Sequence, residues 1–160
     1  MIKHFRIDER LIHGQVATVW VNQLGCSRII VANDLAVKDE LTITALKLAC
    51  PTAVKLSVLS TARAVQNVKD GKYDKDKVFF ITKDVKDCKR VLDLGLEVDT
   101  VNVGNASFKE GKKKVKKSVN LFEDEIEIIK EIIASGVNVT AQMLPNETDQ
   151  SIEVFFKSLS

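Results

Sequence analysis

The strongest constraint on the fold is an alternation of two hydrophobic periods along the chain. Short apolar runs, rich in β-branched residues, are separated by stretches in which apolar residues recur at helical spacing. The runs, which we expect to be strands, are 2–7, 28–32, 54–59, 78–81, 98–103, 119–121 and 137–143. Strands that alternate with helices form βαβ units with parallel strands. We therefore predict an α/β fold, a single domain over residues 1–160 with an open, twisted, mostly parallel β-sheet and helices on both faces.

The intervening helices are predicted from apolar stripes that end at a glycine, a proline or the end of the sequence. The stripes are Val16, Val19, Trp20 and Leu24; Leu41, Ala45, Leu48 and Ala49; Val85, Cys88, Val91 and Leu92; Ile126, Ile129, Ile132 and Ile133; and Ile152, Phe155, Phe156 and Leu159. Asp34, Ser60 and Asp84 each follow an apolar run, so we expect them to be helix N-caps.

The composition excludes several classes of protein. Twenty-four basic residues against 22 acidic ones leave a net charge of only +2, which does not indicate a nucleic-acid-binding protein. The chain has two histidines, so a metal site built from several histidines is excluded. The cysteines, Cys26, Cys50 and Cys88, are odd in number and lack a C-x-x-C pair, which favours reduced thiols in a cytosolic protein. We expect no metal and no cofactor.

The expected location is the cytoplasm. The first residues lack the apolar core of a signal peptide. No apolar run approaches the roughly 20 residues that a membrane-spanning helix needs. We therefore expect no membrane span in this chain.

One segment carries a local excess of positive charge. Residues 109–117 contain six lysines and one glutamate, a charge of +5, so the remainder of the chain has a charge of −3. This segment could be a solvated loop, or it could attract anionic lipid or an acidic partner protein. Nucleic acid is the least favoured partner, because no aromatic residues are interleaved with these lysines.

The loop after the first expected strand contains the side chains best suited to catalysis. In open α/β sheets, ligands bind beyond the carboxyl ends of the strands, and this loop places Asp8, Arg10 and His13 there. A neutral imidazole can accept a phosphoryl group, an arginine can stabilise the transferred charge, and a carboxylate can fix the imidazole tautomer. From these residues alone, a structural role for His13 stays open. His4 lies within the strand, and we expect it to pack or to lie on the surface.

The segment 6–16, Arg-Ile-Asp-Glu-Arg-Leu-Ile-His-Gly-Gln-Val, resembles the active-site signature of enzyme IIB subunits of the bacterial sugar phosphotransferase system. The similarity is to the mannose/fructose/sorbose family and extends along the whole chain. It includes the Ile-Val-Ala-Asn-Asp stretch that ends at Asp34, the segment 55–59, and the segment 102–105 with the lysine-rich segment after it.

This resemblance implies a phosphocarrier, a protein-Nπ-phosphohistidine–sugar phosphotransferase. His13 would carry the phosphoryl group, Asp8 would orient its ring and Arg10 would stabilise the moving charge. Enzyme IIA would be the donor, on a separate chain, and a sugar would be the acceptor during uptake through the membrane subunits IIC and IID. The protein would associate peripherally with the inner face of the membrane through these subunits. The further expected contacts to the phosphate or the partner are Arg6, Leu11, Ile12, Gly14 and Gln15.

Three other classes of protein share features with this sequence. Histidine phosphatases need an Arg-His-Gly motif and a later histidine, but Ile12 stands in the arginine position and no histidine follows His13. Nucleotide binding is disfavoured because neither G-x-G-x-x-G nor a Walker A sequence occurs. A non-catalytic α/β binding or regulatory module stays open as the alternative. The sugar, the phosphorylated nitrogen, the oligomeric state and the strand order also stay open, and the segment after Lys117 could form an antiparallel edge strand.

Overall fold

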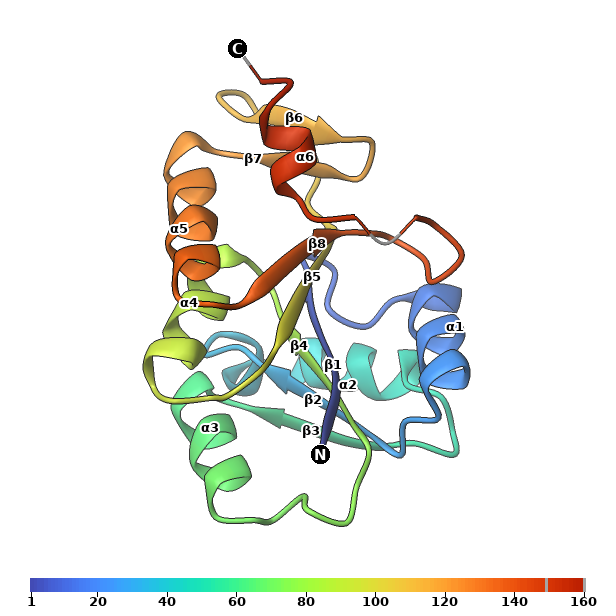
Figure 1. The fold of residues 1–160 in the computed structure, drawn as a ribbon. Helices are drawn as coiled ribbons and strands as arrows, with labels where there is room; N and C mark the ends of the chain where they lie inside the picture. Colours follow the sequence, from blue (N-terminus) through green and yellow to red (C-terminus); the bar gives the residue numbers. More distant parts are fainter. Residues whose placement is uncertain (149, 160) are drawn as a thin grey trace.

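Six parallel strands form the centre of the molecule (Figure 1). The computed structural model describes residues 1–148 and 150–159. In spatial order the strands are β3 (Lys55–Leu59), β2 (Arg28–Ala32), β4 (Val78–Thr82), β1 (Ile2–Asp8), β5 (Thr100–Asn105) and β8 (Asn138–Ala141). Every neighbouring pair is parallel, and β1 lies between β4 and β5. The predicted α/β class is confirmed.

Helices cover both faces of this sheet, as the sequence predicted. They are α1 (Gly14–Leu24), the 3-10 helix η1 (Ala36–Lys38), α2 (Glu40–Ala49), α3 (Thr61–Lys69), α4 (Val85–Asp93), α5 (Glu123–Ala134) and the short α6 (Glu153–Phe156). One core contains buried side chains of α3, α4 and α5, and the other contains those of α1 and α2. In Figure 1, α1 lies on one side of the sheet, and α3, α4 and α5 lie on the other. Among the described residues, no helix is long and apolar enough to cross a bilayer.

Two of the three expected N-caps are confirmed. Ser60 caps α3 by accepting a hydrogen bond from the backbone N–H of Arg63, and Asp84 caps α4 in the same way. The prediction for Asp34 is wrong for the helix that follows it: its carboxylate accepts hydrogen bonds from the backbone N–H and the hydroxyl of Thr61, the first residue of α3. A 3-10 helix follows Asp34 here, and the cap of α2 is Asp39.

The orientation expected for α2 is also wrong. Leu41 and Leu48 are 82% and 83% exposed, while Leu46 is 4% exposed and enters the core. Ile43 and Ala49, at helical spacing from Leu46, are partly buried. The sequence of α2 contains two apolar stripes with the same period, and periodicity cannot distinguish which one faces the sheet.

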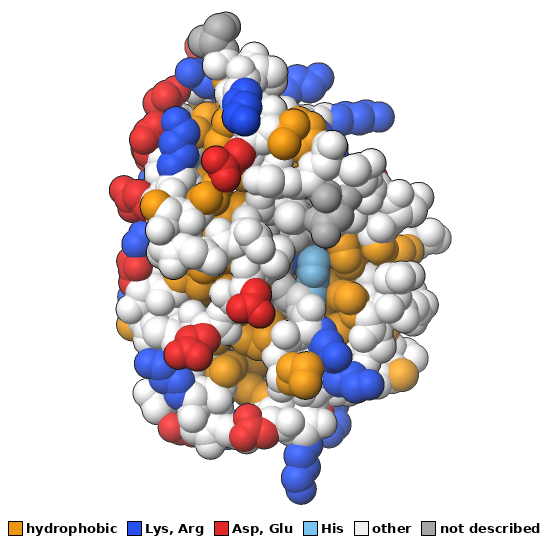
Figure 2. All heavy atoms as spheres, viewed as in Figure 1, with side chains coloured by type: hydrophobic (Ala, Val, Ile, Leu, Met, Phe, Trp, Pro, Cys, Tyr) orange, Lys and Arg blue, Asp and Glu red, His pale blue; other side chains and the backbone are white. Residues whose placement is uncertain are grey.

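The lysine-rich segment forms part of a separate hairpin rather than an edge of the main sheet. Strands β6 (Lys113–Lys116) and β7 (Val119–Leu121) pair antiparallel in a two-stranded sheet after β5. The expected strand at 119–121 therefore exists, but it is not part of the parallel sheet. Figure 2 shows Lys and Arg side chains projecting from the end of the molecule that carries this hairpin.

Candidate functional site

Asp8 and His13 meet at the carboxyl end of the central strand β1. Asp8 is the last residue of that strand, and His13 is the N-cap residue of α1. The turn between them is closed by two hydrogen bonds: the backbone N–H of Leu11 donates to the carbonyl of Asp8 (2.9 Å), and that of Arg10 donates to its Oδ1 (2.9 Å). Leu11 adopts a left-handed backbone conformation, with φ of 59°. This tight turn brings the histidine ring back over the end of its own strand.

The imidazole of His13 is held by the carboxylate of Asp8. Nε2 lies 3.0 Å from Oδ2, and the two residues are 8% and 0% exposed. Burial acts to raise the pKa of Asp8, but the hydrogen bond from His13 and the charge of Arg6 outweigh it and hold the pKa below its ordinary value. Asp8 is therefore ionised at neutral pH and can only accept hydrogen bonds. Nε2 therefore donates to Oδ2, which leaves Nδ1 on the side of the ring that faces away from Asp8.

Arg6 does not lie at the rim, where the sequence placed a phosphate or partner contact. Its residue exposure is 1%, because it lies within the central strand, and its charge is paired inside the protein. Nε donates to Oδ2 of Asp8 at 3.1 Å, and Nη1 donates to Oδ1 of Asn102 at 2.9 Å and to the carbonyl of Gln142 at 3.2 Å. Arg6 thus acts on His13 only through Asp8, which accepts from both on the same oxygen.

Gly104 leaves the space that the guanidinium of Arg6 occupies. A Cβ at this position would overlap the ζ carbon and both terminal nitrogens of Arg6, so that the guanidinium would have to move. Asn102, two residues earlier on β5, is 1% exposed and also donates to the carbonyl of Gln142 (2.9 Å). Sequence reasoning missed these three residues as parts of the site. The only signal in the sequence was the segment 102–105, which carried part of the family resemblance.

His4 packs beside this network, as expected for a residue within the strand. Its ring stacks on Trp20 at a centroid distance of 4.2 Å, and its Nε2 lies 3.4 Å from Oδ1 of Asn102. Burial, with a smaller contribution from the charge of Arg6, lowers the pKa of His4 to about 4. His4 is therefore neutral at physiological pH and adds no positive charge beside Arg6.

The remaining predicted contacts divide into buried and exposed residues. Leu11 and Ile12 are 7% and 4% exposed and pack in the core beneath α1, so they do not form the apolar contact surface that the sequence predicted. The turn directs both side chains inward because the chain reverses between β1 and α1. Arg10, Gly14 and Gln15 are exposed beside His13, and they supply a guanidinium and the start of a helix.

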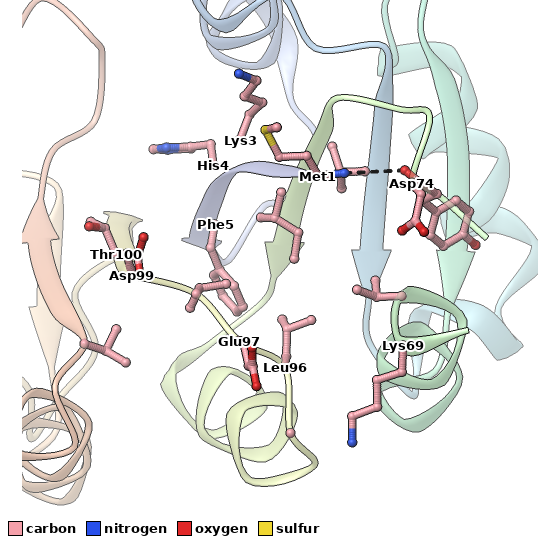
Figure 3. A pocket seen from close by; sticks show the side chains of 17 residues that line it. Met1, Lys3, His4, Phe5, Lys69, Asp74, Leu96, Glu97, Asp99 and Thr100 are labelled. Atoms are coloured by element: carbon pink, nitrogen blue, oxygen red, sulfur yellow. Dashed lines mark hydrogen bonds between the residues drawn. The ribbon is translucent and has the colours of Figure 1, made fainter. Parts of the chain in front are cut away.

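Groups that could hold a metal are not gathered here. Within residues 1–148 and 150–159, no set of three or more His, Cys, Asp or Glu side chains could coordinate an ion. A cavity of about 1010 Å³ lies at the opposite end of the strands, next to the amino-terminal ends of β1 and β5 (Figure 3). His4 and Phe5 line it together with Leu96, and Lys69 and Glu97 lie at its border. His13, at the other end of β1, is not part of it.

The fold and this site define a class of protein in which a histidine, held by a buried aspartate, follows the central strand of a parallel sheet. The family model described as "PTS system sorbose subfamily IIB component" matches residues 2–159. The chain is 31% identical to the sorbose-specific EIIB component of Lacticaseibacillus casei, over 95% of this chain and 92% of that protein. It is 33% identical to the mannose-specific EIIAB component of Escherichia coli K12, over 89% of this chain and 44% of that longer protein.

Solved structures agree with these relatives. The IIBSor domain of the sorbose permease from Klebsiella pneumoniae superimposes with a TM-score of 0.94 at 31% identity, over 100% of this chain and 98% of that one. The N-acetylgalactosamine-specific IIB component 1 from Escherichia coli gives 0.89 at 25% identity, over 94% and 99%. The chain belongs to the sorbose subfamily of phosphotransferase-system IIB components. Such components are phosphotransferases that serve sugar transport.

Replacing Gly104 should disturb His13 although the two residues do not touch. In Gly104→Ala, the new methyl group displaces the guanidinium of Arg6, and Asp8 loses a partner that fixes its orientation. We expect phosphorylation of His13, the role that the family resemblance implies, to slow by about 10-fold or more. Thr100→Ala is the control on the same strand, since Thr100 is exposed and lies at the opposite end of β5 from the site. The measurement is the rate of His13 phosphorylation, with circular dichroism to verify folding. Equal rates in the two variants would contradict the positioning role of Gly104.

Asp8→Asn should destabilise the protein in a pH-dependent way. The substitution leaves the buried guanidinium of Arg6 without its counter-charge, which costs about 3–5 kcal/mol of unfolding free energy at pH 7. Because the pKa of Asp8 is lowered in the folded state, its contribution is present above the unfolded value of about 3.9 and is lost as the pH falls further. The difference between wild type and variant, measured by urea denaturation, should therefore shrink between pH 5 and pH 3. A constant difference over that range would show that the charge of Asp8 does not carry the effect.

Proposed function

We propose that this chain is the IIB phosphocarrier of a sugar transporter and that Nδ1 of His13 carries the phosphoryl group. The observation that carries the proposal is the contact between Nε2 and the ionised carboxylate of Asp8. This contact leaves Nδ1 as the nucleophile and lets Asp8 stabilise the ring when it becomes positively charged. The alternative of a non-catalytic module gives no reason for a buried carboxylate that fixes this tautomer.

The proposed reaction is a transfer between two histidines. Nδ1 of His13 attacks the phosphorus of a phosphohistidine on enzyme IIA, the N–P bond of the donor breaks, and its electron pair returns to the donor imidazole. The transferred oxygens carry negative charge, which the exposed guanidinium of Arg10 is positioned to stabilise together with N–H groups at the start of α1. In the second step, a sugar hydroxyl attacks the phosphorus and releases its proton to the solvent, while the N–P bond breaks and its electron pair returns to the imidazole of His13.

The names of the relatives support the proposed partner proteins. A mannose-specific relative is described as an EIIAB component, and this chain matches 44% of its length, so in that protein a IIA and a IIB part share one chain. For this chain, enzyme IIA is the proposed donor, and the membrane subunits IIC and IID are proposed to present the sugar. The protein would then work at the inner face of the membrane. The related proteins are named for sorbose, mannose, fructose and N-acetylgalactosamine, so the sugar itself is not part of the proposal.

Phosphorylation should depend on one of the two histidines. Phosphoenolpyruvate, the purified upstream carriers and enzyme IIA should place an acid-labile phosphate on wild type, and His13→Ala should abolish it. His4→Gln is the matched control and should keep the label, because the ring of His4 is buried against Trp20. Phosphorus NMR of the labelled protein should show the shift of an Nδ1-phosphohistidine. Label that persists in His13→Ala would overturn the assignment, and an unlabelled wild type would favour the non-catalytic alternative.

Arg10→Ala should slow the transfer without unfolding the protein, because the side chain is exposed and makes no hydrogen bond within the described part of the chain. Loss of one group that stabilises transition-state charge lowers kcat by about 10²–10³-fold. Arg63→Ala, which removes an exposed arginine of α3, should leave the rate unchanged. Stopped-flow or quench-flow transfer from phosphorylated enzyme IIA measures both rates. An unchanged kcat in Arg10→Ala would remove Arg10 from the reaction.

A further inference from the structure

The loop that follows β8 contacts the site at two places, and the proposed reaction gives the loop itself no role. It comprises residues 142–148 and, in Figure 1, extends from the end of β8 toward α1. The carbonyl of Gln142 accepts a hydrogen bond from Nη1 of Arg6 at 3.2 Å. The carbonyl of Met143 accepts one from the indole N–H of Trp20 at 2.9 Å. Two consecutive carbonyls of one loop therefore face the site.

These two carbonyls act on His13 by separate routes. The first binds Arg6, which shares Oδ2 of Asp8 with the imidazole. The second binds Trp20, a residue of α1, and His13 is the N-cap residue of that helix. The loop therefore supports the histidine both through its carboxylate partner and through the helix that begins after it.

Arg6 has no replacement for the carbonyl of Gln142. Its Nε and Nη1 already donate to Asp8 and Asn102, and its Nη2 is buried with no hydrogen-bond partner among the residues that the structure describes. Because a buried charged donor that loses a partner is costly, the guanidinium would move if this carbonyl turned away. The carboxylate that Arg6 shares with the imidazole would move with it.

Glu147 fixes the direction of both carbonyls. Its Oε1 accepts from the backbone N–H of Met143 at 3.3 Å, and its Oε2 accepts from that of Leu144 at 3.1 Å. In a planar trans peptide, as both of these are, the N–H points opposite to the C=O of the preceding residue. The N–H of Met143 shares its peptide unit with the carbonyl of Gln142, and the N–H of Leu144 shares one with the carbonyl of Met143. A carboxylate on one side of the loop therefore directs both carbonyls to the other side, toward the site.

Lys116 of the lysine-rich hairpin holds this carboxylate in place. Its Nζ donates to Oε1 of Glu147 at 3.1 Å and to the carbonyl of Ala141 at 3.0 Å, and it lies 5.4 Å from the centre of the Phe155 ring. Burial acts to raise the pKa of Glu147, but the hydrogen bonds from Lys116 and from the two backbone N–H groups outweigh it and hold the pKa below its ordinary value. Glu147 is therefore ionised at neutral pH and can only accept hydrogen bonds.

We propose that Glu147, held by Lys116, is a positioning residue for His13. Its carboxylate orients two peptide units, and their carbonyls hold the guanidinium and the helix that place the imidazole. The inference rests on the proposed function, because it assigns the placement of the phosphoryl acceptor to residues far from the segment 6–16. Glu147 acts through these groups and not on the phosphoryl group itself.

Removal of the carboxylate tests the proposal. In Glu147→Ala, we expect the single-turnover rate of His13 phosphorylation at saturating phosphorylated enzyme IIA to fall by about 10-fold, because a displaced acceptor spends less time in the geometry for attack. Glu123→Ala is the matched control, since it removes the partner of another hairpin lysine, Lys113, at 2.7 Å, and its side chain is 65% exposed. Its rate should stay within about 2-fold of wild type.

Circular dichroism verifies that both variants fold. If Glu147→Ala does not fold, Glu147→Gln takes its place, because the amide keeps one acceptor oxygen and nearly the same shape. The expected changes then have the same direction and are smaller.

A second measurement observes the imidazole of His13 without any phosphoryl transfer. Nitrogen NMR at mildly alkaline pH should show the tautomer with the proton on Nε2 in wild type and in Glu123→Ala. In Glu147→Ala, both ring-nitrogen resonances of His13 should move toward the average of the two tautomers, because Asp8 no longer holds one orientation of the ring. A role of Glu147 in stability alone would leave these resonances unchanged.

A double variant tests whether Lys116 acts through Glu147. Lys116→Met removes the ammonium and should slow phosphorylation by about 3-fold, less than Glu147→Ala. The combination of the two substitutions should be within about 2-fold of Glu147→Ala alone, because the carboxylate through which the lysine acts is already gone.

Unchanged His13 resonances in Glu147→Ala would overturn the proposal, and a slower rate combined with unchanged resonances would assign Glu147 to contact with the donor instead. Equal changes in Glu123→Ala would also overturn it, and multiplied losses in the double variant would remove Lys116 from the arrangement. The proposed function fails separately, if wild type takes no phosphate on His13. In that case the NMR comparison still decides whether Glu147 positions the ring.

Discussion

A single carboxylate oxygen, Oδ2 of Asp8, links the buried guanidinium of Arg6 to the imidazole of His13. An arginine inside a central strand is costly to bury, and it is tolerated here because Asp8, Asn102 and the carbonyl of Gln142 accept its hydrogen bonds. The same oxygen then fixes the ring of His13. Two of the most buried charges of the sheet therefore set the orientation of the histidine that follows β1. This link also explains why β5 and the end of β8, which lie far from the segment 6–16 in the sequence, matter to the site.

The architecture could be predicted because the two hydrophobic periods differ strongly, and because parallel strands need helical connections. The orientation of α2 could not, since Leu41 and Leu48 form a stripe as regular as the one around Leu46. The role of Asp34 was missed for a related reason. A carboxylate after a strand can cap any nearby helix, and only the three-dimensional arrangement directs it to Thr61 instead of its own segment.

The site was predictable only where its residues are close in the sequence. Asp8, Arg10 and His13 fall within one loop, so their chemistry could be inferred together from the motif. Arg6 was assigned to the phosphate because an arginine near a histidine favours that interpretation, but its partners Asn102 and Gln142 lie 96 and 136 residues away. They meet Arg6 only because β5 and β8 follow β1 in the sheet, an order that periodicity does not encode.

The stack of His4 on Trp20 has a practical consequence for this protein. Trp20 is the one tryptophan of the chain, and its indole N–H donates to the carbonyl of Met143 at 2.9 Å. The guanidinium of Arg6 lies 5.7 Å from the centre of its ring. Indole emission responds to nearby charge and to the polarity of its surroundings. The molecule thus contains a built-in fluorophore that only Arg6 and Asp8 separate from His13, so its emission can be followed without any attached dye.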